Sequence, residues 1–131
     1  MKTKEEELRA ISETLEAGEH IRSFIWCTHD LSQIPQDTPC CGTLAVTSER
    51  LIFYSSTFGT PWVKFINYHH ISSTRLEKNL LDPGSSEHII LMNRNVREVF
   101  KYLPDADALE HFIAALGQES GIDVSNHAFH M

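Results

Sequence analysis

The sequence predicts a mainly β domain, in which about seven short antiparallel strands form a barrel, a C-terminal helix caps it and a short helix precedes it. Hydrophobic residues recur with helical spacing before residue 18 and again after residue 105. Between residues 20 and 103 they alternate or run together over short segments, as strands do. Turn-forming residues separate these segments. The length of 131 residues fits a single domain.

The N-terminal segment has the pattern of a short amphipathic helix. Thr3 and Glu6 have capping-box spacing, in which each side chain accepts a hydrogen bond from a free N–H at the start of the helix. Gly18 is a suitable residue to end the helix. Helical spacing places three apolar side chains on one face: Leu8, Ile11 and Leu15. This narrow apolar stripe can pack across the barrel or dock on another chain.

The central segments have β character. Some alternate between apolar and polar residues, whereas residues 20–28 are apolar enough to be buried on both faces. Residues 81–84 suit a turn with Pro and Gly at its centre, and Asn93-Arg94-Asn95 suits a hairpin because Asn tolerates the left-handed conformation. The expected strands are residues 20–28, 42–47, 51–54, 62–68, 71–77, 87–92 and 96–103.

A second helix is expected after Pro104, with Asp105 as its N-cap and Gly117 at its end. Four apolar residues lie on one face of it: Leu109, Phe112, Ile113 and Leu116. Such a wide stripe suits a helix that plugs one open end of a barrel. We therefore divide the chain into an N-terminal amphipathic helix (1–17), a central domain (18–117) and a flexible C-terminal tail (118–131).

The charge of the chain argues against a polyanionic partner. Eleven Lys and Arg against eighteen Asp and Glu give a formal net charge of −7. The basic residues are spread along the sequence without a cluster. Nucleic-acid binding and strong binding to anionic membranes are therefore not expected.

Several features indicate a cytoplasmic location. The first residues lack the apolar core of a secretion signal, and no apolar stretch approaches the roughly 20 residues that cross a bilayer. Three cysteines, Cys27, Cys40 and Cys41, are an odd number. Free thiols in a reduced protein explain them more simply than a disulfide framework does.

One segment resembles a known family. Residues 42–54, Gly-Thr-Leu-Ala-Val-Thr-Ser-Glu-Arg-Leu-Ile-Phe-Tyr, resemble the G-x-L-x-x-T-x-x-R-L-I-F hairpin of bacterial pleckstrin-homology-like (PH-like) domains of the YokE-like type, and are similar to the GRAM branch of that superfamily. Residues 68–73, Tyr-His-His-Ile-Ser-Ser, resemble the family's Y-x-x-I-x-S segment. Phe100 and the helix containing Phe112 extend the match over roughly residues 18–117. The resemblance implies a PH-like interaction module, in some members an oligomer, without enzymatic activity.

Two residues of this hairpin are expected to be structural. Thr47 can hydrogen-bond the turn backbone, and Arg50 can bridge to carbonyls or to a nearby carboxylate. The resemblance also raises phosphoinositide binding, which in eukaryotic PH domains uses basic residues around the first hairpin. The corresponding loop here, residues 28–41, contains Asp30 and Asp37 but neither Lys nor Arg. A phosphoinositide is therefore not expected at this loop.

Four residues are candidate metal ligands: Cys27, His29, Cys40 and Cys41. Their spacing matches no zinc module, and Cys27 also suits a small buried apolar side chain, so the metal question stays open and no cofactor is expected. The sequence has no G-x-S-x-G, P-loop, G-x-G-x-x-G or H-E-x-x-H motif. The only conceivable pair of a nucleophile and a base is Cys40 or Cys41 with His29, and its placement in one loop is weak support for catalysis. An enzyme is therefore not expected.

A binding surface is expected instead. Tyr54, Phe58 and Trp62 cluster around a turn-rich segment, and aromatic residues near loops are common interface anchors, although they equally suit a core. Edge strands of an incompletely closed barrel also offer backbone groups for strand addition. We expect protein binding, either as a homo-oligomer or with another protein. A small-ligand or lipid-binding barrel without a phosphoinositide site, and a Cys/His metal site, are the alternatives.

Overall fold

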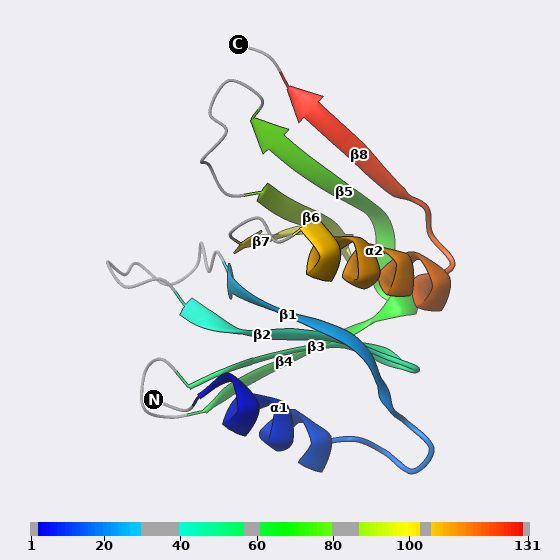
Figure 1. The fold of residues 1–131 in the computed structure, drawn as a ribbon. Helices are drawn as coiled ribbons and strands as arrows, with labels where there is room; N and C mark the ends of the chain where they lie inside the picture. The colour runs from blue at the N-terminus through cyan, green and yellow to red at the C-terminus, as the bar shows by residue number, and fades with distance from the viewer. Residues whose placement is uncertain (1–2, 30–39, 57–60, 80–86, 103–105, 130–131) are drawn as a thin grey trace.

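A computed structural model describes residues 3–29, 40–56, 61–79, 87–102 and 106–129 of the chain. Helices and strands follow one another through these residues (Figure 1). Their order is α1 (Lys4–Glu13), β1 (Ile21–His29), β2 (Cys40–Thr47), β3 (Arg50–Ser55), β4 (Trp62–Asn67), a 3-10 turn η1 (Tyr68–His70), β5 (Ile71–Asn79), β6 (Glu87–Asn93), β7 (Val96–Tyr102), α2 (Ala106–Ser120) and β8 (Val124–Phe129).

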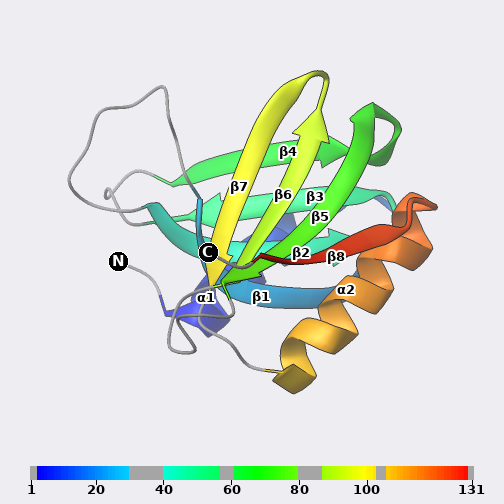
Figure 2. The same ribbon diagram turned by 90° about the horizontal axis from the view of Figure 1, so that it is seen from above.

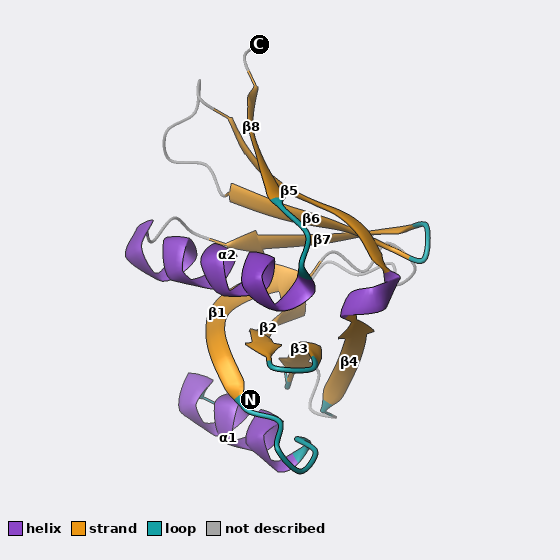
Figure 3. Cartoon of the chain, turned by 90° about the vertical axis from the view of Figure 1, so that its right-hand side faces the viewer, coloured by secondary structure: helices purple, strands orange, loops and turns teal. Residues whose placement is uncertain are grey.

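All eight strands belong to one sheet, in the order β4-β3-β2-β1-β7-β6-β5-β8. Strands β1 to β7 pair antiparallel, which confirms the predicted architecture of seven antiparallel strands with a helix before and after them. β1 and β7 are joined by the pairs Thr28↔Lys101 and His29↔Phe100. At this junction the sheet bends into two layers, β1–β4 and β5–β8 (Figures 1 and 3).

The two helices cover different parts of this sheet. α2 lies between the two layers at one open side and contacts β1, β2 and β8 (Figures 1 and 3). α1 lies outside the barrel, across β2 and β3. The predicted plug is therefore α2, and α1 packs across the first layer, which is one of the two roles that its apolar stripe allowed. Neither helix is long and apolar enough to cross a membrane, within the part of the chain that the structure describes.

The buried residues form two clusters, one on each side of the first layer. The main core lies between the layers and α2, and its largest fully buried side chains include Phe53, Phe100 and Phe112. The smaller cluster lies beneath α1 and consists of Ile11, Ala45, Ile52 and Tyr54. A sheet that is covered on both faces explains why β3 is buried along almost its whole length.

α1 begins with the predicted capping box. Thr3 Oγ1 accepts from the Glu6 backbone N–H at 3.1 Å, and Glu6 Oε1 accepts from the Thr3 N–H at 3.3 Å. The helix ends at Glu13, earlier than predicted. Gly18, with φ of +84°, belongs to a separate turn before β1 instead of ending the helix.

The C-terminal residues differ from the predicted flexible tail. α2 continues through Gly117 to Ser120, and Gly121, with φ of +73°, follows it. β8 then pairs parallel with β5, from Thr74↔Val124 to Asn79↔Phe129. Residues 118–129 therefore complete the helix and add an edge strand. β8 is formed by hydrogen bonds between backbones, which any residue type can make. A polar sequence such as this one therefore gives no clear signal for the strand.

The β6–β7 hairpin turns at Arg94 and Asn95, as predicted. Both residues have positive φ, +51° and +68°. Positive φ at both central positions defines the tight turn whose twist matches that of two flanking antiparallel strands. The turn also fixes the register that places Met92 opposite Arg97.

Gly42, near the start of β2, has no room for a side chain. A Cβ added there would clash with the backbone carbonyl oxygen of Tyr54 and lie 2.9 Å from Cζ of Phe53. We expect Gly42→Ala to lower the free energy of unfolding by about 2 kcal/mol, because the strands would have to move apart. Urea denaturation checks this, with Gly117→Ala as the control. A Cβ at Gly117 meets its nearest neighbour at 3.7 Å, and equal losses for the two variants would contradict the prediction.

Candidate functional site

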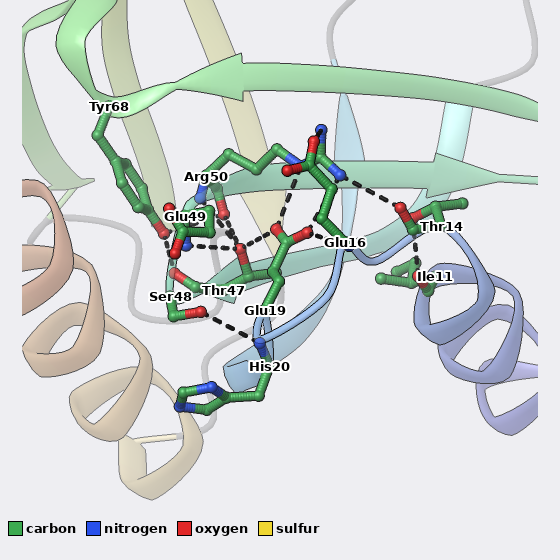
Figure 4. Close-up of polar contacts among 10 residues, drawn as sticks. All are labelled: Ile11, Thr14, Glu16, Glu19, His20, Thr47, Ser48, Glu49, Arg50 and Tyr68. Carbon is green, nitrogen blue, oxygen red and sulfur yellow. Dashed lines mark hydrogen bonds and ion pairs between the residues drawn. The ribbon is translucent and has the colours of Figure 1, made fainter.

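The β2–β3 turn is tied to the chain between α1 and β1 by a buried carboxylate (Figure 4). Glu19 is buried, and both of its oxygens accept hydrogen bonds from the Arg50 guanidinium, at 3.1 and 3.2 Å. Arg50 also donates to the carbonyl oxygen of Thr14, at 3.2 Å. We call Glu19, Arg50 and Thr47 the hairpin lock. It fixes where α1 lies on the first layer.

Thr47 makes the turn itself rigid. Its Oγ1 accepts from the backbone N–H groups of Glu49 and Arg50, at 3.1 and 3.0 Å, and lies 2.6 Å from Glu19 Oε2. The Tyr68 hydroxyl lies 2.7 Å from the Thr47 carbonyl oxygen and 3.0 Å from that of Arg50. Burial raises the pKa of Tyr68, so this phenol remains a hydrogen-bond donor.

The charge of Glu19 is held by its partners. Burial alone would raise the pKa of this carboxyl, but hydrogen bonds from Thr47 and the Glu16 backbone, together with the Arg50 charge, lower it. A carboxylate with this many donors is already satisfied. The hairpin lock is therefore structural, and it explains why Thr47 and Arg50 stand three residues apart at this turn.

A second buried carboxylate joins the two layers. Glu98, on β7, is 3% exposed and contacts three side chains from other strands. Asn93 Nδ2 donates to Glu98 Oε2 at 3.1 Å, Lys64 on edge strand β4 forms an ion pair with the same oxygen, and His29 Nε2 lies 3.2 Å from Oε1. We call Glu98, Lys64 and His29 the interlayer cluster.

The position of the imidazole proton follows from the neighbours of His29. Its Nδ1 lies 3.2 Å from the carbonyl oxygen of Val99, which can only accept, so Nδ1 carries a proton. Nε2 points toward Glu98 and lies 3.2 Å from Oε1, in a contact that does not have hydrogen-bond geometry.

These contacts set the protonation of Glu98. Burial would raise the pKa of its carboxyl, but the contacts with His29, Lys64 and Asn93 outweigh burial and lower the pKa to about 2. Around the cluster, rings are packed closely. His29 stacks on Phe100 with centroids 4.4 Å apart and lies 5.3 Å from Phe53 and 6.0 Å from Trp62. The interior beside the cluster is filled by these side chains.

The candidate metal ligands lie on different faces of the sheet. Cys27 and His29 point into the core from alternate positions of β1, and both are buried. Cys41 pairs with Thr28, on the opposite face, and burial and the charge of Glu7 raise the pKa of its thiol. The side chain of Cys40 lies outside the described residues. No group of three or more potential ligands forms among the side chains that the structure describes.

The predicted aromatic anchors do not share a surface. Tyr54 is 4% exposed and lies beneath α1, whereas Trp62 packs against the main core from the other face of the first layer. Phe58 lies outside the described residues. Tyr54 is thus a core residue, as the alternative interpretation of these aromatic residues held. Trp62 is half-buried.

The exposed aromatic residues lie on a different row of the first layer. Phe24, Ala45, Ile52 and Phe65 are paired side by side across β1 to β4. α1 covers the two central residues, which are fully buried, while Phe24 and Phe65 at the two ends are each 47% exposed. We call these four residues the outer row. Sequence reasoning missed it because the row is defined only by strand register.

Comparisons with known proteins identify the fold. No family model matches the chain, and no curated protein matches it. Among solved structures, the Vps36 N-terminal PH domain is similar, with a TM-score of 0.58 and 13% identity over 79% of this chain and 83% of that one. The hSac2 domain from the human phosphoinositide phosphatase Sac2 has a TM-score of 0.56 and 10% identity, covering 100% and 93%. The C-terminal domain of an unknown protein from Leishmania infantum has a TM-score of 0.57 and 18% identity, covering 79% and 86%. The chain therefore has a PH-like fold.

Proposed function

We propose that the chain is a non-catalytic PH-like interaction module that binds protein, either a second copy of itself or another chain, through the outer side of its first layer. The outer row carries this proposal. Large aromatic side chains that are half exposed on a rigid surface are typical anchors of protein interfaces. Phe24 and Phe65 have this exposure, and the helix between them is fixed by the hairpin lock.

The rigidity of this surface comes from buried polar contacts as well as from the lock. Glu7 of α1 is fully buried; its carboxylate accepts from Thr43 Oγ1 at 3.1 Å and from the backbone N–H and hydroxyl of Ser56, at 3.0 and 2.9 Å. A helix held at both ends needs little ordering when a partner binds, which favours affinity. The closely packed rings around His29 fill the interior beside it. This favours a binding surface on the outside of the first layer over a small-ligand site in the interior.

We also propose that the chain belongs to the bacterial YokE-like and GRAM-like branch of the superfamily and acts in the cytoplasm. The hairpin supports the first proposal, since hydrogen bonds join Thr47, Arg50 and Tyr68. Gly42, which the resemblance also includes, has no room for a side chain. The odd number of cysteines supports the second.

Light scattering over a range of concentrations tests the proposed binding. Self-association through the outer row gives an apparent mass above the 14.9 kDa of one chain, and Phe24→Ser with Phe65→Ser returns it to that value. Val96→Ser is a matched control, because Val96 is 48% exposed on the other layer. A wild-type chain that stays at 14.9 kDa at every concentration would contradict self-association and leave binding to another protein. A mass that the Val96 variant lowers equally would contradict the assigned surface.

A further inference from the structure

The second layer carries a group of basic side chains on its outer side. Ile89, Leu91 and Phe100 face the core, so the alternate residues of β6 and β7 face outward. Strand register places Arg75 beside Ile90 and Val99, His88 beside Lys101, and Met92 beside Arg97. We define the basic face as Arg75, His88, Arg97 and Lys101.

The cationic groups of this face are open to a partner. Arg97 and Lys101 are exposed, and the Arg75 side chain is 44% exposed. No ion pair between described residues involves Arg97 or Lys101, whereas Arg75 lies 3.7 Å from Glu77. Ile90 and Val99, which lie between these residues in the strand register, are buried. In Figure 2 neither helix lies over β5, β6 and β7.

The face is electropositive although the chain is not. Burial lowers the pKa of His88, and the charges of Lys101 and Arg97 lower it further, against the opposing charge of Glu77. The formal net charge of the chain is −7. The sequence showed no basic cluster because these residues come from three strands. Only the register of β5, β6 and β7 brings them together.

We propose that the basic face binds an extended, acidic protein segment. The basic face lies on the second layer and the outer row on the first, so this binding goes beyond the proposed function. Residues four apart on a strand lie about 13 Å apart on the same face, so Arg97 and Lys101 match carboxylates at positions i and i+4 of an extended segment. Arg75, about 10 Å across the sheet, can take a third carboxylate beside that line.

The small size of the face favours such a segment over a polyanion. The three formal cations share the face with the carboxylate of Glu77. Around them, the net charge of −7 repels a membrane surface or a nucleic acid, both of which extend beyond the face. A short acidic segment lies over the cations of the basic face only. It therefore avoids most of the repulsion from the negative charge elsewhere on the chain.

Fluorescence anisotropy of a labelled synthetic peptide tests the proposal. The peptide alternates Glu with Thr, and an otherwise identical peptide alternates Gln with Thr. We expect the wild-type chain to bind the Glu peptide and not the Gln peptide, and Arg97→Glu with Lys101→Glu to weaken binding roughly tenfold or more. Lys4→Glu with Arg9→Glu changes the net charge equally on α1 and should leave binding unchanged. Arg97→Gln with Lys101→Gln provides a milder variant, and circular dichroism checks folding.

Three outcomes would overturn the proposal: no binding of the Glu peptide at about 1 mM, equal loss in the α1 variant, or tighter binding to phosphatidylserine vesicles or duplex DNA than to the peptide. Light scattering of the same variants separates this proposal from the proposed function. Self-association that persists without peptide binding overturns the basic face alone. A monomer that binds the peptide supports the basic face and removes self-association.

Discussion

Glu98→Gln is expected to lower the free energy of unfolding by about 3 kcal/mol at neutral pH. The pKa of Glu98 is about 2 in the folded protein, against an ordinary value of 4.5. This difference is worth about 3 kcal/mol by linkage. The substitution also leaves Lys64 and His29 beside a neutral group, and breaking a buried ion pair on one side costs a similar amount. Urea denaturation followed by circular dichroism measures the loss.

The same cluster predicts a dependence on pH. A carboxyl whose folded pKa is depressed contributes stability above its ordinary pKa, and that contribution disappears as pH falls through the folded value. The difference between wild type and Glu98→Gln should therefore shrink between pH 4.5 and pH 2. Glu13→Gln, at an exposed position of α1, is the control and should cost little at any pH. A loss for Glu98→Gln that is as large at pH 2 as at pH 7 would rule out this electrostatic origin.

Removing both charges tests whether the loss comes from the unpaired partner. Lys64→Met with Glu98→Met takes away the ion pair and fills its volume with apolar atoms. Replacing a buried ion pair in this way is often neutral. We therefore expect the double variant to be more stable than Glu98→Gln alone.

Arg50→Ala is expected to lower the free energy of unfolding by about 3 kcal/mol, because it leaves the buried Glu19 carboxylate without its cation. Besides lowering the stability of the whole domain, the substitution should loosen the attachment of α1. Arg50 also holds the Thr14 carbonyl at the end of α1. We therefore expect the amides of α1 to exchange with solvent faster, as hydrogen exchange would measure.

Arg50→Lys separates charge from geometry. Lysine keeps the charge, but a single ammonium cannot serve both Glu19 oxygens and the Thr14 carbonyl as the guanidinium does. It should recover only part of the loss. Arg9→Ala, an exposed cation on α1, is the control and should change stability by less than about 0.5 kcal/mol. Full recovery with lysine would show that charge alone matters.

The architecture was largely predictable because it depends on local patterns. The capping box at Thr3 and the turn at Arg94 and Asn95 are signals within a few residues of chain. β8 was not predictable, because its pairing with β5 is a backbone interaction across about fifty residues of sequence, and its polar residues show no clear alternation. The ends of the helices were also missed, because each end was expected at a glycine. Gly18 instead lies in a separate turn with positive φ, and Gly117 lies within α2 without close neighbours.

The polar contacts were less predictable than the strands. Glu7, Glu19 and Glu98 are all buried, although carboxylates are rarely so. One signal was present: Glu7 precedes Ile11 by four residues and therefore lies on the apolar face of α1. The cations that pair with Glu19 and Glu98 are distant in the sequence: Arg50 lies 31 residues from Glu19, and Lys64 lies on another strand from Glu98. Only the folded register shows that these charges meet.

The junction between the layers has a consequence for how the chain assembles. Within each layer most strands pair with their neighbours in sequence, so forming either layer closes only short loops and loses little chain entropy. The contacts that join the layers are different, since Thr28 and Lys101 are 73 residues apart. We therefore expect docking of the two hairpin arrays, rather than their formation, to carry most of the loop-closure entropy of folding.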